Sequence, residues 1–172
     1  LYQLLVQLLG RTRRYAVEDP GYPLLARMYE QQDAQVAHIG LDDSGIDIDA
    51  LEASGASVAH IMPSHQFPTG IVTTAARRRE LLNWAREGDR YLIEDDYDSE
   101  FRMAGRPIPS LFGIDAAERV LYLNSFAKSL GAAFRMAYLV LPPQLAQRFR
   151  KQLGFYANTV SPLDQLALAR FI

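Results

Sequence analysis

The chain has 172 residues, of which 49% are hydrophobic and 22% charged, and its formal net charge at pH 7 is -2. This is enough for one globular domain with a hydrophobic core, and the charge gives no reason to expect that the segment itself binds nucleic acid or acidic membranes. The absence of cysteine excludes disulfides and thiolate metal sites. No apolar run approaches the ~20 residues that span a bilayer, and no signal peptide is visible, so we expect a cytoplasmic protein.

Short apolar runs alternate with longer helical patterns along the chain. In chain order, they predict a helix at Leu1–Leu9, a strand at Tyr15–Glu18, a helix at Leu24–Gln32, a strand at Val36–Gly40, a helix at Ile48–Ala53, a strand at Val58–Met62, a helix at Ala75–Arg86, strands at Tyr91–Glu94, Val120–Leu123 and Met136–Leu141, and helices at Gln144–Leu153 and Pro162–Ile172. Strands separated by helices predict an α/β fold with a doubly wound, mostly parallel sheet. Both ends fall within helical patterns that lack capping residues, which predicts that the domain is truncated at both ends.

In such a sheet, ligands bind beyond the carboxyl ends of the strands. Polar strings follow four predicted strands, at Glu18–Tyr22, Pro63–Gly70, Glu94–Asp98 and Asn124–Ser129. The second string contains a histidine, His65. His38 and His60 lie inside strand patterns, and we interpret them as packed residues rather than catalysts.

Lysine is rare in this chain. Lys128 and Lys151 are the two lysines among 18 basic residues. Lys151 lies on a helix face that we expect to be solvated, whereas Lys128 directly follows a predicted strand and has small neighbours that leave room for a ligand. An amine, unlike a guanidinium, can lose its proton and form a Schiff base with an aldehyde. We favour a cofactor role for Lys128 over an exposed loop lysine.

Phosphate recognition is a candidate role for the residues around this lysine. Arg135 lies seven positions beyond it, and a guanidinium offers a fork of N–H donors that suits a phosphate. Ser125 and Ser129 could add hydroxyl donors. The alternative for Arg135 is a surface ion pair.

Five acidic residues fall in the seven positions 94–100. Such a cluster could bind Mg²⁺ or Ca²⁺, provide one carboxylate to a protonated pyridine nitrogen, or form a solvated acidic loop. The metal interpretation fits less well, because no second acidic or glycine-rich phosphate loop is visible, and we predict no metal site. Tyr97 could donate to a phenolic oxygen, and Tyr22 at the first strand exit could stack on a flat ring.

Four of these strings together resemble fold-type-I PLP-dependent aminotransferases, and more narrowly the aminotransferase-like domain of MocR-type regulators of the GntR family. The strings are Val17–Pro23, Pro63–Gly70, Ile93–Arg102 and Ser125–Leu130. The resemblance covers nearly the whole chain in the same order. It implies that residues 1–172 form the PLP-binding large-domain core, with a winged-helix domain and a small C-terminal domain outside this chain.

The resemblance also assigns roles around pyridoxal 5'-phosphate (PLP). Lys128 would form the internal aldimine as the catalytic residue. Asp95 would contact the pyridine nitrogen, with Asp96 less favoured, and Tyr22 would stack on the ring. Tyr97, and more weakly Gln66, would contact the phenolic oxygen. Ser125 and Arg135 would bind the phosphate. Both turns next to the cofactor would contain cis peptides, at Asp19-Pro20 and Phe67-Pro68. Ala127 departs from the family, which usually has Ser or Thr there.

The leading hypothesis is an effector-sensing domain of a MocR-type transcriptional regulator, with an amino-acid-like small molecule as effector. DNA would be bound through a domain outside this chain, no membrane would be involved, and the full-length protein would be a homodimer. The alternative is a free-standing class I/II aminotransferase acting on an amino acid. A third interpretation is an α/β fold without a cofactor.

Overall fold

A computed structural model describes residues 1–98, 108–131 and 135–171. The helices are α1 Tyr2–Leu9, α2 Pro23–Glu30, α3 Ile48–Ala53, α4 Ala75–Arg86, α5 Leu111–Ile114, α6 Pro143–Gln152 and α7 Pro162–Phe171. The strands are β1 Arg14–Asp19, β2 Gln35–Asp42, β3 Gly45–Ile46, β4 Val58–Ile61, β5 Tyr91–Asp95, β6 Val120–Ser125 and β7 Ala137–Val140. Residues 99–102 of the third family-like string, the end of the last predicted helix at Ile172, and two small neighbours of Lys128 at 132 and 133 lie outside the described residues.

The predicted α/β sheet is confirmed. Its strand order is β3-β2-β1-β4-β5-β6-β7. The pairs between β2 and β6 are parallel, whereas β3 and β7 run antiparallel to their neighbours. The chain leaves β1 toward β2 and then returns to place β4 on the other side of β1. The carboxyl ends of β1 and β4 therefore flank a switch point, where ligands bind in open α/β sheets.

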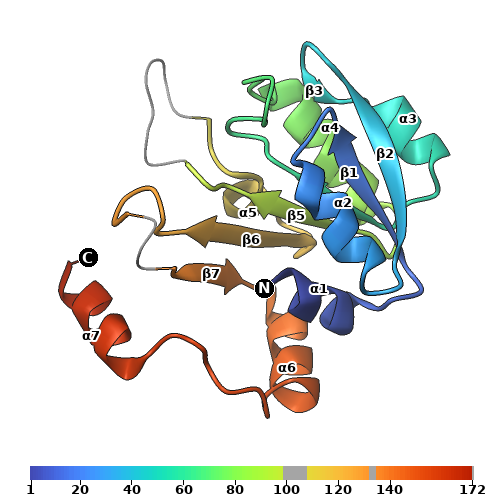
Figure 1. Cartoon of the computed structure of the whole chain (residues 1–172). Helices are drawn as coiled ribbons and strands as arrows, with labels where there is room; N and C mark the ends of the chain where they lie inside the picture. The colour runs from blue at the N-terminus through green and yellow to red at the C-terminus, as the bar shows by residue number, and fades with distance from the viewer. Residues whose placement is uncertain (99–107, 132–134, 172) are drawn as a thin grey trace.

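Two hydrophobic clusters cover the two faces of the sheet. One contains buried residues of α1, α2 and α6, and the other contains buried residues of α3, α4 and α5. Successive strand residues alternate between them: Tyr15 and Val17 belong to the first cluster and Ala16 to the second. Helix α7 has no buried residue and lies apart from the sheet in Figure 1.

Every predicted strand and helix has a counterpart, with ends that differ by at most two residues. The two-residue β3 and the four-residue α5 were not predicted, because so short a segment shows no period. The interpretation of His38 as a packed residue is wrong. Its side chain is exposed on β2, next to the short edge strand, whereas His60 is buried on the central β4.

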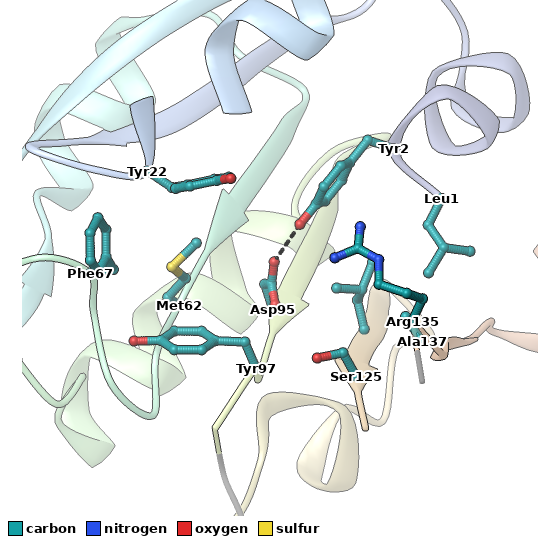
Figure 2. A pocket seen from close by; sticks show the side chains of 11 residues that line it. Leu1, Tyr2, Tyr22, Met62, Phe67, Asp95, Tyr97, Ser125, Arg135 and Ala137 are labelled. Carbon is teal, nitrogen blue, oxygen red and sulfur yellow. Dashed lines mark hydrogen bonds between the residues drawn. The ribbon is translucent and has the colours of Figure 1, made fainter. Parts of the chain in front are cut away.

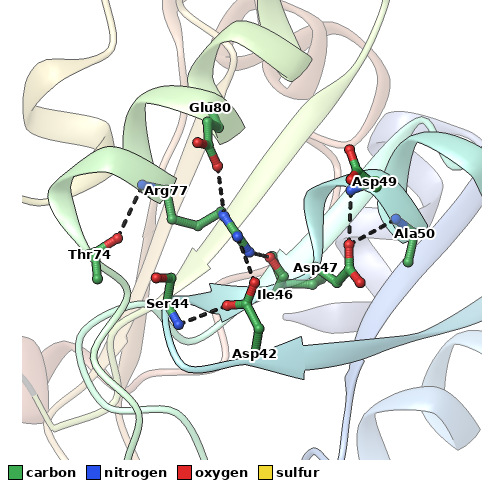
Figure 3. Close-up of polar contacts among 9 residues, drawn as sticks. All are labelled: Asp42, Ser44, Ile46, Asp47, Asp49, Ala50, Thr74, Arg77 and Glu80. Atoms are coloured by element: carbon green, nitrogen blue, oxygen red, sulfur yellow. Dashed lines mark hydrogen bonds and ion pairs between the residues drawn. The ribbon is translucent and has the colours of Figure 1, made fainter.

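The hairpin of β2 and β3 is fastened to α4 by one arginine (Figure 3). Arg77 donates to Asp42 Oδ2 and Glu80 Oε2, each at 2.7 Å, and to the backbone oxygen of Ile46. Thr74 caps the same helix by accepting from the Arg77 backbone N–H at 3.2 Å. This link holds the edge of the sheet against α4, away from the switch point.

Both predicted cis peptides are confirmed, at Asp19-Pro20 and Phe67-Pro68. The buried Gln66 side chain joins the two turns, donating to the backbone oxygens of Pro20 at 2.9 Å and Phe67 at 2.6 Å. A Cβ at Gly21 would lie 2.2 Å from the Glu18 backbone oxygen, so the first turn requires glycine. These contacts fix where the side chains beyond β1 and β4 project.

No helix in the part of the chain that the structure describes is long and apolar enough to cross a bilayer.

Candidate functional site

A cavity of about 490 Å³ lies at the carboxyl ends of the central strands (Figure 2). This volume is in the range of small-molecule sites. Five of the seven predicted site residues line it, and they come from four separate segments: Tyr22, Asp95, Tyr97, Ser125 and Arg135. The fold thus brings together side chains up to 113 positions apart, as the strand-exit argument expects.

The cavity wall is chemically divided. Figure 2 shows Arg135 and Ser125 on one side of Asp95, and Tyr22 and Phe67 on the other. The Tyr22 and Phe67 rings meet edge to face, with centroids 6.3 Å apart. The wall therefore offers a cation and a hydroxyl at one end, a carboxylate between, and aromatic surface at the other end.

Two predicted residues do not line the cavity. Lys128 is exposed in the turn 126–130 that directly follows β6, as is Ser129. Gln66 Nε2 donates to the backbone oxygens of the two cis turns and more distantly, at 3.4 Å, to Glu18 Oε2, and the Gln66 oxygen accepts from the Thr69 hydroxyl at 2.6 Å. The contact of Gln66 with a cofactor stays a prediction, and its observed contacts are those of a residue that shapes the turns.

The three acids at the end of β5, Glu94 to Asp96, are buried rather than part of a solvated loop. Glu94 is fully buried, and Asp95 and Asp96 are each 4% exposed. Because neighbouring residues of an extended segment point to opposite sides, Asp95 lines the cavity while Asp96 accepts from the Tyr122 hydroxyl at 2.8 Å. The carboxylate available to a ligand in the cavity is that of Asp95.

Asp95 is held by two residues that the sequence did not single out as functional. Its Oδ2 accepts from the Tyr2 hydroxyl at 3.0 Å and lies 3.3 Å from His60 Nε2. Burial, followed by the charge of Asp95, raises the pKa of Tyr2 above its ordinary value. Tyr2 had no sequence signal, being an aromatic in the first turn of a helix, and His60 looked like any packed strand residue.

Tyr97 has a second set of neighbours at the rim of the cavity. The His65 ring stacks on it, with centroids 6.3 Å apart and planes 17° from parallel, and His65 Nδ1 lies 2.6 Å from Asp98 Oδ2. Burial first, and then Asp98, raises the pKa of Tyr97 to about 12. Tyr97 therefore keeps its hydroxyl hydrogen.

Beneath the two cis turns lies Glu18, which is 6% exposed. Its Oε2 accepts from the Met62 backbone N–H at 3.1 Å, and its Oε1 is buried without a partner among the described residues. Burial raises the pKa of this carboxyl to about 7. Glu18 thus ties the exit of β1 to that of β4 without lining the cavity.

The family model for aminotransferase class I and II matches residues 1–170. The chain belongs to this family.

Within the family, the chain is similar to bacterial regulators. It is 40% identical over its whole length to the uncharacterized HTH-type transcriptional regulator YdeL of Bacillus subtilis, and covers 37% of that protein. It is 33% identical over 91% of its length to the probable rhizopine catabolism regulatory protein MocR of Rhizobium meliloti, and covers 32% of it. The chain thus spans about a third of the length of these curated relatives.

Solved aminotransferases have the same fold. The kynurenine aminotransferase of Pyrococcus horikoshii, solved in complex with PMP, superposes with a TM-score of 0.86 at 27% identity over 99% of this chain and 45% of its own. The α-aminoadipate aminotransferase LysN of Thermus thermophilus gives a TM-score of 0.85 at 26% identity over 99% of this chain and 46% of its own. The family and these neighbours imply PLP as the cofactor class.

Proposed function

We propose that this chain is the PLP-binding, effector-sensing core of a MocR-type transcriptional regulator. The observation that carries the proposal is the convergence of Tyr22, Asp95, Tyr97, Ser125 and Arg135 on one cavity. The similarity to regulators along at least 90% of the chain favours a regulator over a plain enzyme. The winged-helix domain that would contact DNA, and the small C-terminal domain, would lie outside residues 1–172.

The lining of the cavity fits PLP in charge and shape. Arg135 and Ser125 offer N–H and O–H donors to a phosphate, and they lie together on one side of Asp95 (Figure 2). Tyr22 offers an aromatic face to a planar ring. Asp95 is a buried carboxylate that can accept from a protonated ring nitrogen, and Tyr97 can donate to an oxygen on the ring.

When bound, PLP supplies an electron sink for reactions of amino acids. The protein's part is to hold and orient it. Lys128 would hold the cofactor covalently through its amine, which lies in the turn that begins one residue after Ser125. An amino-acid-like effector that competes for this link would change the contacts of the turn. In a cytoplasmic homodimer, that local change would be passed to the DNA-binding domains.

The second candidate is a free-standing class I/II aminotransferase acting on an amino acid. The TM-scores of 0.85 and 0.86 with solved aminotransferases favour it, because the same scaffold supports transamination in those enzymes. The two functions differ in the full-length protein. A regulator carries a DNA-binding segment and changes its DNA affinity with the effector, whereas an enzyme converts an amino acid and a keto acid over many turnovers.

The role of Lys128 is tested in the full-length protein by Lys128→Ala. We expect the visible absorption band of protein-bound PLP to be lost, and borohydride to fix no cofactor to the protein. Lys151→Ala is the matched control, because Lys151 is an exposed lysine on α6 and should leave both measurements unchanged. A Lys128→Ala protein with the wild-type band and the wild-type yield of fixed cofactor would refute the assignment.

A further inference from the structure

A buried chain of polar contacts runs from the cavity into the core. His60 Nε2 lies 3.3 Å from Asp95 Oδ2, and His60 Nδ1 lies 2.6 Å from the Tyr29 hydroxyl. Asp95 on β5 is 4% exposed, His60 on β4 is 1% exposed, and Tyr29 on α2 is fully buried. At such burial, each polar atom needs a partner of the opposite kind, because an unsatisfied group is destabilising.

Asp95 and Tyr29, the partners of the two His60 ring nitrogens, decide which nitrogen of His60 carries the hydrogen. A carboxylate oxygen can only accept, so Nε2 carries a hydrogen and donates to Asp95. Burial raises the pKa of Tyr29 well above its ordinary value, so this phenol keeps its hydrogen. Among the described residues, His60 Nδ1 is the contact that the structure gives the Tyr29 hydroxyl. The arrangement that satisfies every group has Tyr29 donating to Nδ1 and Nε2–H donating to Asp95.

Tyr2 completes the arrangement from the cavity side. Its hydroxyl donates to the same Asp95 oxygen, Oδ2, at 3.0 Å, and its ring lies against His60 with centroids 5.4 Å apart. Two donors on Oδ2 fix the orientation of the carboxylate. Oδ1 is then the oxygen of Asp95 that this network does not occupy.

We propose that Tyr29 is a positioning residue that fixes the Nε2–H tautomer of His60 and thereby holds the Asp95 carboxylate aimed into the cavity, with Tyr2 as the second donor. Without the Tyr29 hydroxyl, His60 can adopt the other neutral tautomer. That tautomer has its hydrogen on Nδ1 and turns a lone pair of Nε2 toward Asp95. The relevance to PLP rests on the proposed function, whereas the tautomer itself does not.

The tautomer is measured by nitrogen NMR of the full-length, cofactor-free protein with ¹⁵N-labelled histidine. The His60 signals are assigned by their loss in His60→Asn. We expect a protonated Nε2 and a bare Nδ1 in the wild type, and displaced Nδ1 and Nε2 shifts in Tyr29→Phe. Tyr15→Phe is the matched control. Tyr15 stacks on Tyr29 at 4.7 Å, but its own hydroxyl donates to the Gly10 backbone oxygen, so its loss should leave the His60 shifts in place.

Two results would overturn the inference. One is a wild-type His60 with its hydrogen on Nδ1, which needs no variant to fold. The other is a Tyr29→Phe protein whose His60 shifts equal those of the wild type, or move no more than in Tyr15→Phe. Either would mean that the hydroxyl of Tyr29 does not set the tautomer.

The affinity for PLP tests whether the tautomer of His60 matters to the cofactor site. We expect Tyr29→Phe and Tyr2→Phe to raise the Kd for PLP roughly tenfold, the effect of one hydrogen bond to a charged group, and Tyr15→Phe to leave it unchanged. Unchanged Kd values in Tyr29→Phe and Tyr2→Phe would overturn the role of the network toward the cofactor. A wild-type protein that binds no PLP would instead refute the proposed function, and would leave the NMR result standing.

Discussion

The last residue of β5, Asp95, and the acid that follows it, Asp96, have different surroundings. Asp95 lines the cavity and accepts from Tyr2, whereas Asp96 accepts from Tyr122 on the other side of the extended segment. Both are almost fully buried, so burial alone does not distinguish them. What distinguishes them is the direction of the side chain, which decides which acid a ligand can reach.

Replacing each acid by its amide separates the two roles. Asp95→Asn keeps an acceptor for Tyr2 but removes the charge, so we expect an added amino acid to change the cofactor spectrum more slowly, by on the order of 10²-fold. Asp96→Asn keeps an acceptor for Tyr122 and should change the rate far less. Single-turnover absorbance of both proteins is the measurement. A slower reaction in Asp96→Asn than in Asp95→Asn would mean that Asp96, and not Asp95, is the carboxylate that contacts the cofactor.

Glu18 makes stability depend on pH. Its pKa is raised by burial from 4.5 to about 7 in the folded protein, so the folded state favours the protonated form. The contribution of protonated Glu18 to the stability of the folded state is full below about pH 4.5 and is lost as the pH rises to about 7. Relative to Glu18→Gln, the free energy of unfolding of the wild type should fall by on the order of 3 kcal/mol across that range.

Urea unfolding of both proteins at pH 5 and pH 8 measures this difference. Glu30→Gln, at the exposed end of α2, serves as the control and should show no such pH dependence relative to the wild type. A wild type and a Glu18→Gln protein that respond equally to pH would contradict a raised pKa at Glu18.

At the scale of an element, helix α4 carries three successive arginines with different surroundings. Arg77 binds the β2–β3 hairpin, and Arg79 is exposed. Arg78 is 1% exposed and donates to the backbone oxygens of Thr73, Pro63 and Pro109. It also lies 3.5 Å from the buried Glu94, which in turn accepts from two backbone N–H groups at the start of α5.

Alanine at each position should therefore have a different effect. Arg78→Ala leaves Glu94 and three carbonyls without a cation, and should lower the free energy of unfolding by about 3–5 kcal/mol. Arg77→Ala breaks partly exposed ion pairs and should lower it by about 1 kcal/mol. Arg79→Ala should stay within about 0.5 kcal/mol of the wild type. Denaturant unfolding of the three proteins gives the order, and equal values for Arg78→Ala and Arg79→Ala would contradict it.

At the scale of the whole molecule, the parallel sheet makes the site. Parallel strands align their carboxyl ends, so loops after β1, β4, β5 and β6 meet at one edge. The two antiparallel strands lie at the two edges of the sheet. The cis turns fastened by Gln66 and Glu18 then place Tyr22 and Phe67 opposite Arg135 and Ser125 (Figure 2).

The sequence alone determined the order and kind of the main elements, because periods of 2 and 3.6 in apolar residues reflect which face each element buries. It also determined where chemistry would gather, since polar strings after buried strands mark the carboxyl edge. From these strings and their resemblance to a family came five of the residues that line the cavity. The exposed position of Lys128 and the position of Gln66 outside the lining were not visible in the pattern.

Only the tertiary structure decided the contacts between elements distant in sequence. It placed Tyr2 on Asp95 across 93 positions, His60 between Asp95 and Tyr29, and Arg78 rather than its neighbours beside Glu94. The physical reason is that local periodicity reports whether a side chain is buried. The partner that satisfies a buried polar atom depends on which strands and helices the chain topology makes neighbours.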